Sequence, residues 1–250
     1  MSNFDKDTLA ALDYIDKVNP FATYLEDSTL SRVGGWIDTG SYVLNAIVSG
    51  SIHGGIPKGR VTMLGGESMT GKTLFVLKIL ANAQKEGLIP VIFDTENAVD
   101  PEGAERIGLD ISKVKYVPCV TIEQTRNALY KFLTSVKEKG LEGKFIVAID
   151  SLGNLQSELE HSRMGKESTA SDMGSKARAM KSLMQTCTNL GATTQTTVLA
   201  TNHVYDDPAA MFPSIEKHMP GGKSIVYLPS VTVQLARKPM KSDGGKTMDA

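Results

Sequence analysis

The sequence has little cysteine, little net charge and no long hydrophobic run. Its 250 residues include two cysteines, Cys119 and Cys187, which lie far apart and lack the spacing of metal ligands. We therefore expect two buried thiols in a reducing compartment rather than a disulfide or a zinc site. The formal net charge is −1, so any surface that binds nucleic acid would have to be a local one.

Membrane and secretion signals are also missing from the sequence. There is no stretch of about 18 apolar residues, and the N-terminus lacks the pattern of a signal peptide. These absences predict a cytoplasmic location and no membrane partner. The composition is 41% hydrophobic and 22% charged, which is ordinary for a globular protein, and the length suffices for one large α/β domain or two small ones.

Short β-branched runs alternate with helical patterns from Trp36 onward. This alternation predicts an α/β fold in which a mostly parallel, twisted sheet carries helices on both faces. Runs such as FIVAI are apolar on both faces, as a central parallel strand requires. The predicted strands cover residues 60–64, 89–95, 144–150, 196–202 and 230–238, and the predicted helices cover 72–86, 122–139 and a segment that ends near Leu190.

The first 35 residues differ in character from the rest. The run FDKDTLAALDYIDKV predicts one short amphipathic helix, and a linker follows it. The chain therefore divides into an N-terminal segment, 1–35, and a core, 36–250. The closing run PMKSDGGKTMDA is polar and supplies no helix or hairpin partner, so we expect the core to be incomplete at its C-terminus.

A complete G-x-x-x-x-G-K-[ST] pattern, GESMTGKT, lies between a predicted strand and a predicted helix. Its glycines let successive backbone N–H groups turn toward phosphate oxygens at the helix N-terminus. Lys72 would reach the β- and γ-phosphates, and the Thr73 hydroxyl would bind Mg²⁺. The predicted nucleotide-binding residues are Gly66, Glu67, Ser68, Met69, Thr70, Gly71, Lys72, Thr73 and Leu74.

Carboxylates follow two other predicted strands. Asp150 ends the run FIVAI and would orient a water on the metal, the alternative being a cap on the next segment. In FDTENAVD, Glu96 is placed to act as general base on a water near the γ-phosphate, as hydrolysis of a nucleotide requires. Asp100 precedes Pro101 and is typical of a helix N-cap, which leaves Asp94 a supporting role.

Four segments together resemble the RecA-type recombinases. They are GGIPKGRVTMLGGESMTGKT (54–73), FDTENAVDP (93–101), FIVAIDSLGNL (145–155) and SDMGSKARAMKSLM (171–184). The runs DSLGNL and TNH look closest to the T4-like phage branch, the UvsX type.

The resemblance covers about residues 36–238 and implies a RecA-like P-loop NTPase core with ATP and Mg²⁺ as cofactors. It also implies a helical filament of subunits on single-stranded DNA that hydrolyses ATP and exchanges strands with homologous duplex DNA. Such a protein works in the host cytoplasm if phage-encoded, with a recombination mediator and a single-strand-binding protein as further partners.

The resemblance also implies roles for individual residues. Glu96 matches the family's catalytic glutamate, His203 matches its γ-phosphate sensor, and Lys72 completes the catalytic set. Two DNA-binding loops are implied, at about 156–174 and 204–222, although each could equally be a solvated connection with ordinary charges. The implied DNA-contacting residues are Arg163, Met173, Gly174, Arg178, Met211, Phe212, Gly221 and Gly222.

Some features depart from the family pattern or leave its function open. Gly103 stands where the family often has a tyrosine that stacks on adenine, and Phe21 and Tyr24 lie where neighbouring subunits would join. One alternative is a truncated or regulatory RecA-fold module that binds ATP or DNA without full turnover. Another is a different RecA-fold ATPase such as a helicase, although the Met-Phe and Gly-Gly pairs of the second loop favour a recombinase.

Overall fold

A six-stranded sheet forms the centre of the computed structural model, which describes residues 4–163 apart from 20, 29 and 31, residues 173–205 and 217–237, and the pairs 240–241 and 247–248. The strand order is β5-β4-β6-β7-β3-β8, and every neighbouring pair is parallel. The strands are β3 (Val61–Gly66), β4 (Ile89–Asp94), β5 (Lys115–Pro118), β6 (Phe145–Asp150), β7 (Thr197–His203) and β8 (Val231–Leu235). The predicted parallel α/β fold is confirmed.

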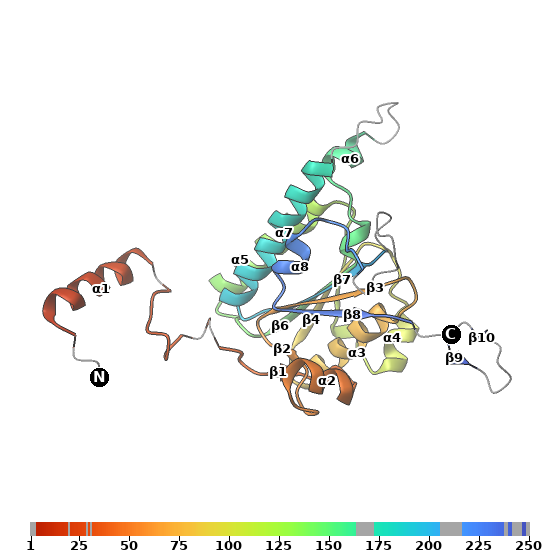
Figure 1. Ribbon diagram of the computed structural model, residues 1–250, viewed down its shortest axis with the longest axis horizontal. Helices are drawn as coiled ribbons and strands as arrows, with labels where there is room; N and C mark the ends of the chain where they lie inside the picture. Colours follow the sequence, from red (N-terminus) through yellow and green to blue (C-terminus); the bar gives the residue numbers. More distant parts are fainter. Residues whose placement is uncertain are drawn as a thin grey trace.

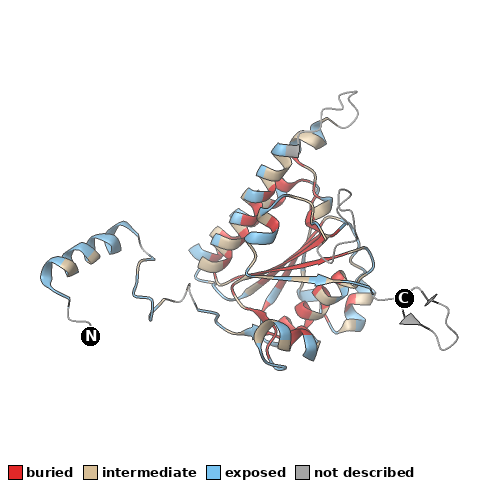
Figure 2. Ribbon diagram, viewed as in Figure 1, coloured by how far each residue is buried: buried red, intermediate tan, exposed pale blue. Residues whose placement is uncertain are grey.

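Helices cover both faces of this sheet (Figure 1). One face carries α3 (Lys72–Lys85) and α4 (Pro101–Ile107), and the other carries α5 (Ile122–Glu138), α7 (Met173–Thr193) and α8 (Ser224–Tyr227). Successive residues of each inner strand alternate between the two cores, as Val147 and Ala148 do in β6. Figure 2 shows the resulting buried layer along the inner strands.

The remaining elements lie around this core. They are α1 (Lys6–Val18), the paired strands β1 (Trp36–Ile37) and β2 (Ile56–Pro57), α2 (Tyr42–Ser49), α6 (Glu158–Ser162), the paired strands β9 (Met240–Lys241) and β10 (Thr247–Met248), and two short 3₁₀ turns at Ile111–Lys113 and Leu152–Asn154. Helix α1 begins after its N-cap Asp5, has no buried residue and stands apart from the core (Figure 1). It matches the amphipathic helix predicted for this segment.

Three other features bear on the predictions. Both cysteines lie buried, as predicted, and burial raises the pKa of the Cys187 thiol to about 12. The strand predicted for 230–238 is shorter and ends at Leu235. Within the described residues, no helix is both long enough and apolar enough to span a bilayer.

Candidate nucleotide-binding site

Four adjacent strands, β4, β6, β7 and β3, end at the same edge of the sheet. In register, Asp94 lies opposite Asp150 and Gly66 opposite His203. The carboxyl ends of parallel strands are where α/β proteins place their ligands. The topology therefore brings the P-loop and the predicted acids to one place.

The P-loop joins β3 directly to α3. Gly71 precedes the helix with φ 88° and ψ 15°, a left-handed conformation that glycine adopts without strain. A side chain at Gly66 would place its Cβ 3.1 Å from the Leu235 carbonyl oxygen on the neighbouring strand. This loop therefore depends on its glycines.

Lys72 bends back over the loop, where its ammonium group donates to the carbonyl oxygens of Gly66 and Glu67 at 2.9 and 2.8 Å. Burial lowers the pKa of Lys72, while the nearby Asp150 and Glu96 carboxylates oppose that shift. An ammonium group held among backbone carbonyls beside a helix N-terminus is placed to bind a phosphate.

Asp150 joins the P-loop helix to strand β7. The Thr73 hydroxyl donates to Asp150 Oδ2 at 2.7 Å, and the Thr201 hydroxyl donates to Oδ1. Burial raises the pKa of Asp150, against the hydrogen bonds from Thr201 and Thr73, which lower it. Hydroxyl and carboxylate oxygens are the ligands that Mg²⁺ takes alongside nucleotide phosphates, so this pair fits the metal.

Glu96 and His203, the predicted base and sensor, contact each other. Glu96 Oε1 accepts a hydrogen bond from Ser151 Oγ at 2.6 Å and lies 3.0 Å from His203 Nε2. Their side chains are 28% and 34% exposed, so solvent reaches both. Both of these contacts are to Oε1, and among the described residues no hydrogen bond to Oε2 is present.

Asp94 and Asp100 have separate structural roles. The Asp94 carboxylate is buried, and its Oδ1 accepts from the backbone N–H groups of Glu96 and Asn97 at 2.9 Å each. It therefore holds the loop that carries Glu96. Asp100 lies immediately before Pro101, and its carboxylate accepts hydrogen bonds from the backbone N–H groups of Glu102 and Gly103. This confirms the predicted N-cap.

Two cations from distant segments contact the P-loop. Lys217 binds the Glu67 carboxylate, and the Arg237 guanidinium donates to the Ser68 carbonyl oxygen. These contacts span 150 and 169 sequence positions, so no local pattern could reveal them. Roles for Ser151 and Thr201 were likewise not predicted. A signal for Thr201 existed in the sequence, since it is a polar residue near the end of an otherwise buried run.

The Gly221–Gly222 turn of the second predicted DNA loop lies against α7, the helix that follows the first loop. Gly221 and Gly222 have φ of 106° and 84°, and Cβ atoms built there would lie 3.1 Å from Met180 and 3.5 Å from Ala177 of α7. Arg178, on the same helix, is exposed, and its Nε donates to the Gly174 carbonyl oxygen at 3.2 Å.

The other predicted DNA-contacting residues are less well defined. Arg163 follows α6 as its C-cap, and Met173 is the first residue of α7. Met211 and Phe212 lie outside the described residues.

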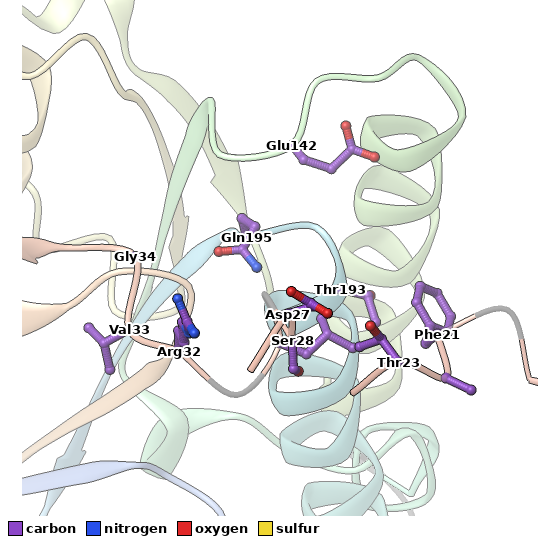
Figure 3. A pocket seen from close by; sticks show the side chains of 12 residues that line it. Phe21, Thr23, Asp27, Ser28, Arg32, Val33, Gly34, Glu142, Thr193 and Gln195 are labelled. Atoms are coloured by element: carbon purple, nitrogen blue, oxygen red, sulfur yellow. The ribbon is translucent and has the colours of Figure 1, made fainter. Parts of the chain in front are cut away.

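A hollow of about 780 Å³ lies at the opposite edge of the sheet (Figure 3). Linker residues such as Phe21 and Arg32 form one side, and Glu142, Thr193 and Gln195, which precede β6 and β7, form the other. Among its described lining residues there is no residue of the predicted nucleotide site. The hollow is therefore separate from the candidate nucleotide site.

Comparison with known proteins gives a consistent result. A family model described as the RecA N-terminal domain matches residues 10–249. Protein RecA of Chlorobium chlorochromatii is 33% identical over 210 residues, which cover 83% of this chain and 55% of that protein. Protein RecA of Chlorobaculum parvum is 33% identical over 221 residues, covering 88% and 59%, and that of Aquifex aeolicus is 28% identical over 210 residues, covering 84% and 57%. The chain thus spans just over half the length of these relatives.

Proposed function

The chain belongs to the RecA family, and on that premise we propose that it is an ATP-dependent recombinase that assembles on single-stranded DNA and pairs it with homologous duplex DNA. The observation that carries the proposal is the contact of Glu96 with His203 and Ser151 at the sheet edge that also holds the P-loop. A carboxylate held in one orientation beside the phosphate site is placed to act as general base on a water molecule.

The P-loop residues would bind and orient the ATP phosphates. Backbone N–H groups of the loop and the Lys72 ammonium hold the phosphate oxygens. Thr73 and Asp150, already joined at 2.7 Å, would hold Mg²⁺, which when bound neutralises charge on the phosphates. Positioning and charge neutralisation account for most of the catalysis in this class of reaction.

Glu96 would take the proton from the attacking water through its Oε2 atom. Ser151 and His203 bind Oε1 and so fix the direction of the carboxylate. Because His203 ends β7, a change in its contacts on nucleotide binding would reach the chain that follows that strand. His203 thereby serves as the γ-phosphate sensor in this proposal.

Single-stranded DNA would bind the two loops and the start of α7, against which the Gly221–Gly222 turn lies. Exposed Arg178 and the backbone N–H groups at Gly221 and Gly222 are suited to phosphates. Apolar side chains of the second loop, Met211 and Phe212, would stack between bases, a contact typically worth about 1–3 kcal/mol per base.

The N-terminal segment, 1–35, would join neighbouring subunits in a filament. Its helix α1 has no buried residue, so its apolar side chains are available to another copy. We further propose membership of the T4-like phage branch, the UvsX type, on the runs DSLGNL and TNH. Such a protein would act in the cytoplasm of the host cell, together with a mediator and a single-strand-binding protein.

The test measures ATP hydrolysis with and without single-stranded DNA for the wild type and Glu96→Gln. We expect turnover that DNA stimulates in the wild type, and a loss of about 100-fold or more in Glu96→Gln with nucleotide binding retained, since a general base contributes about 10²–10⁴-fold. Glu102→Gln, a nearby exposed carboxylate in α4, is the matched control and should behave as wild type.

The other outcomes are equally informative. Hydrolysis retained in Glu96→Gln would remove Glu96 as the base. An absence of turnover in the wild type, with and without DNA, would contradict the recombinase and support a module that binds without hydrolysis.

A further inference from the structure

Tyr116, on the edge strand β5, contacts the carboxylate that holds the loop carrying Glu96. The Tyr116 hydroxyl donates to Asp94 Oδ2 at 3.1 Å. We propose that Tyr116 is a positioning residue for ATP hydrolysis, acting through Asp94 on the loop that presents Glu96. That hydrolysis is the reaction affected rests on the proposed function. The position of Tyr116 rests on contacts among described residues.

Asp94 needs this hydroxyl because its carboxylate is buried, with an exposed fraction of 1%. Its Oδ1 has two close donors, whereas the nearest backbone donor to Oδ2 is the Val99 N–H group at 3.4 Å. A buried carboxylate without donors is costly, so the charge is stable only while each oxygen is satisfied. Tyr116 supplies the shortest contact to Oδ2.

The loop held by Asp94 has a demanding backbone conformation. Asn97 has φ of 53°, in the left-handed region that asparagine tolerates better than most residues. Its side-chain oxygen also lies 3.4 Å from the Tyr116 hydroxyl. Tyr116 therefore contacts both Asp94, which holds the backbone of the loop, and Asn97, at its turn.

The sheet register explains how a residue on β5 reaches this loop. Tyr116 pairs with Ile92 of β4, and Asp94 lies two positions further along the same strand. Residues two apart on a strand share a face, so the tyrosine and the carboxylate lie on the same face as diagonal neighbours. Tyr116→Phe would keep the ring and remove only the hydroxyl donor.

The hydroxyl keeps its proton under ordinary conditions. Although the Tyr116 side chain is exposed, partial desolvation of its hydroxyl, and then the charge of Asp94 and its hydrogen bond, raise the pKa of Tyr116. The group is therefore a donor across the neutral range. Glu96 is thus fixed twice, its side chain by Ser151 and His203 and its backbone by the Asp94–Tyr116 pair.

The test uses Tyr116→Phe in the full chain, with two measurements. Steady-state hydrolysis should show a kcat about tenfold lower at unchanged KM, because the nucleotide contacts lie on the P-loop. Hydrogen exchange should show faster exchange of the Glu96 and Asn97 amides, since they donate to Asp94, with the other sheet amides unchanged.

Two control variants separate positioning from stability. Tyr130→Phe, at an exposed position on α5, should leave both measurements unchanged. Ile92→Val removes one methyl group beside Tyr116 and lowers stability, yet it leaves the donor in place. It should therefore leave kcat and the two amides unchanged.

Other results of these measurements would contradict the proposal or the proposed function. Unchanged exchange at Glu96 and Asn97, or an unchanged kcat in an enzyme that turns over, would overturn it. Faster exchange throughout the sheet would show a purely structural role and overturn it as well. If the wild type hydrolyses no ATP, the proposed function fails, while the exchange measurement alone still decides whether Tyr116 holds the loop.

Discussion

Glu67 and Ser68 are consecutive P-loop residues, and each is bonded to a cation from a distant part of the chain. Lys217 binds the Glu67 carboxylate, and Arg237 donates to the Ser68 carbonyl oxygen. A carboxylate beside a phosphate site repels the nucleotide, and a bound ammonium group offsets that charge. Lys217 therefore links nucleotide affinity to the chain between β7 and α8.

We expect Lys217→Ala to weaken ATP binding about two- to fivefold, because it leaves the Glu67 charge beside the phosphates. The pair is partly exposed, which limits such couplings to about 1 kcal/mol or less. Glu67→Gln should bind at least as well as the wild type, and the double variant should return close to it. The measurement is titration of a fluorescent ATP analogue. A double variant that binds as weakly as Lys217→Ala would show that the loss does not come from the unpaired Glu67 charge.

At the residue scale, the sequence predicts the parts of the site that belong to short patterns. Lys72 and Thr73 lie in the P-loop motif, and Asp150 and Glu96 follow short apolar runs that favour buried strands. Tyr116 lies in no such pattern, because its importance comes from the pairing of β5 with β4. Long-range hydrogen bonds of ordinary residue types leave no local signal.

The exposed start of α7 is the described element best placed to meet DNA. Lys176, Arg178 and Lys181 lie within two turns of it, and the Gly221–Gly222 turn packs against the same stretch. Of these three cations, Lys176 is paired with Glu160 at 3.6 Å, whereas Arg178 and Lys181 are exposed, on a chain whose net charge is −1. Binding by such a local group of cations falls as salt rises, since counterions are released from DNA.

Arg178→Ala should lower the affinity for single-stranded DNA several-fold and reduce the salt slope by about 1, because one phosphate contact is lost. Fluorescence anisotropy with a labelled oligonucleotide across a salt series is the measurement. Lys131→Ala, an exposed cation on α5, is the matched control. Equal behaviour of the two variants would exclude Arg178 from the DNA surface.

At the element scale, prediction succeeds for central strands and fails at the periphery. β6 is apolar on both faces up to Asp150, which is the signal of a strand covered by helices on each side, and β7 has a shorter apolar run, Val198–Ala200. β5 is a four-residue edge strand with mostly exposed residues, so its pattern resembles a loop. α2 has eight residues and was not predicted either.

The largest units of the described chain are the sheet with its covering helices and helix α1, which stands outside them. The core holds the candidate nucleotide site, whereas α1 exposes Leu9, Ile15 and Val18 to solvent. Exposed apolar side chains on one amphipathic helix are typical of a segment that packs on a partner. Removing α1 takes no buried surface from the core.

A variant without residues 1–19 should keep its melting temperature within a few degrees, since no buried contact of α1 is lost. We expect it to lose assembly on single-stranded DNA in the presence of ATP. Differential scanning fluorimetry and sedimentation velocity are the measurements. Asp13→Asn and Lys17→Gln together change only charged positions of α1 and are the control. Unchanged assembly after deletion would show that this helix does not join subunits.

The contacts that build the nucleotide site join residues 55, 77 and 107 positions apart along the chain. Such pairs meet only when four strands are in register, because closing long loops costs entropy before any contact forms. Competence to hold a nucleotide therefore arises late in folding, although the P-loop motif itself is contiguous. A nucleotide that recognises only the finished sheet would slow unfolding and leave the rate of refolding unchanged.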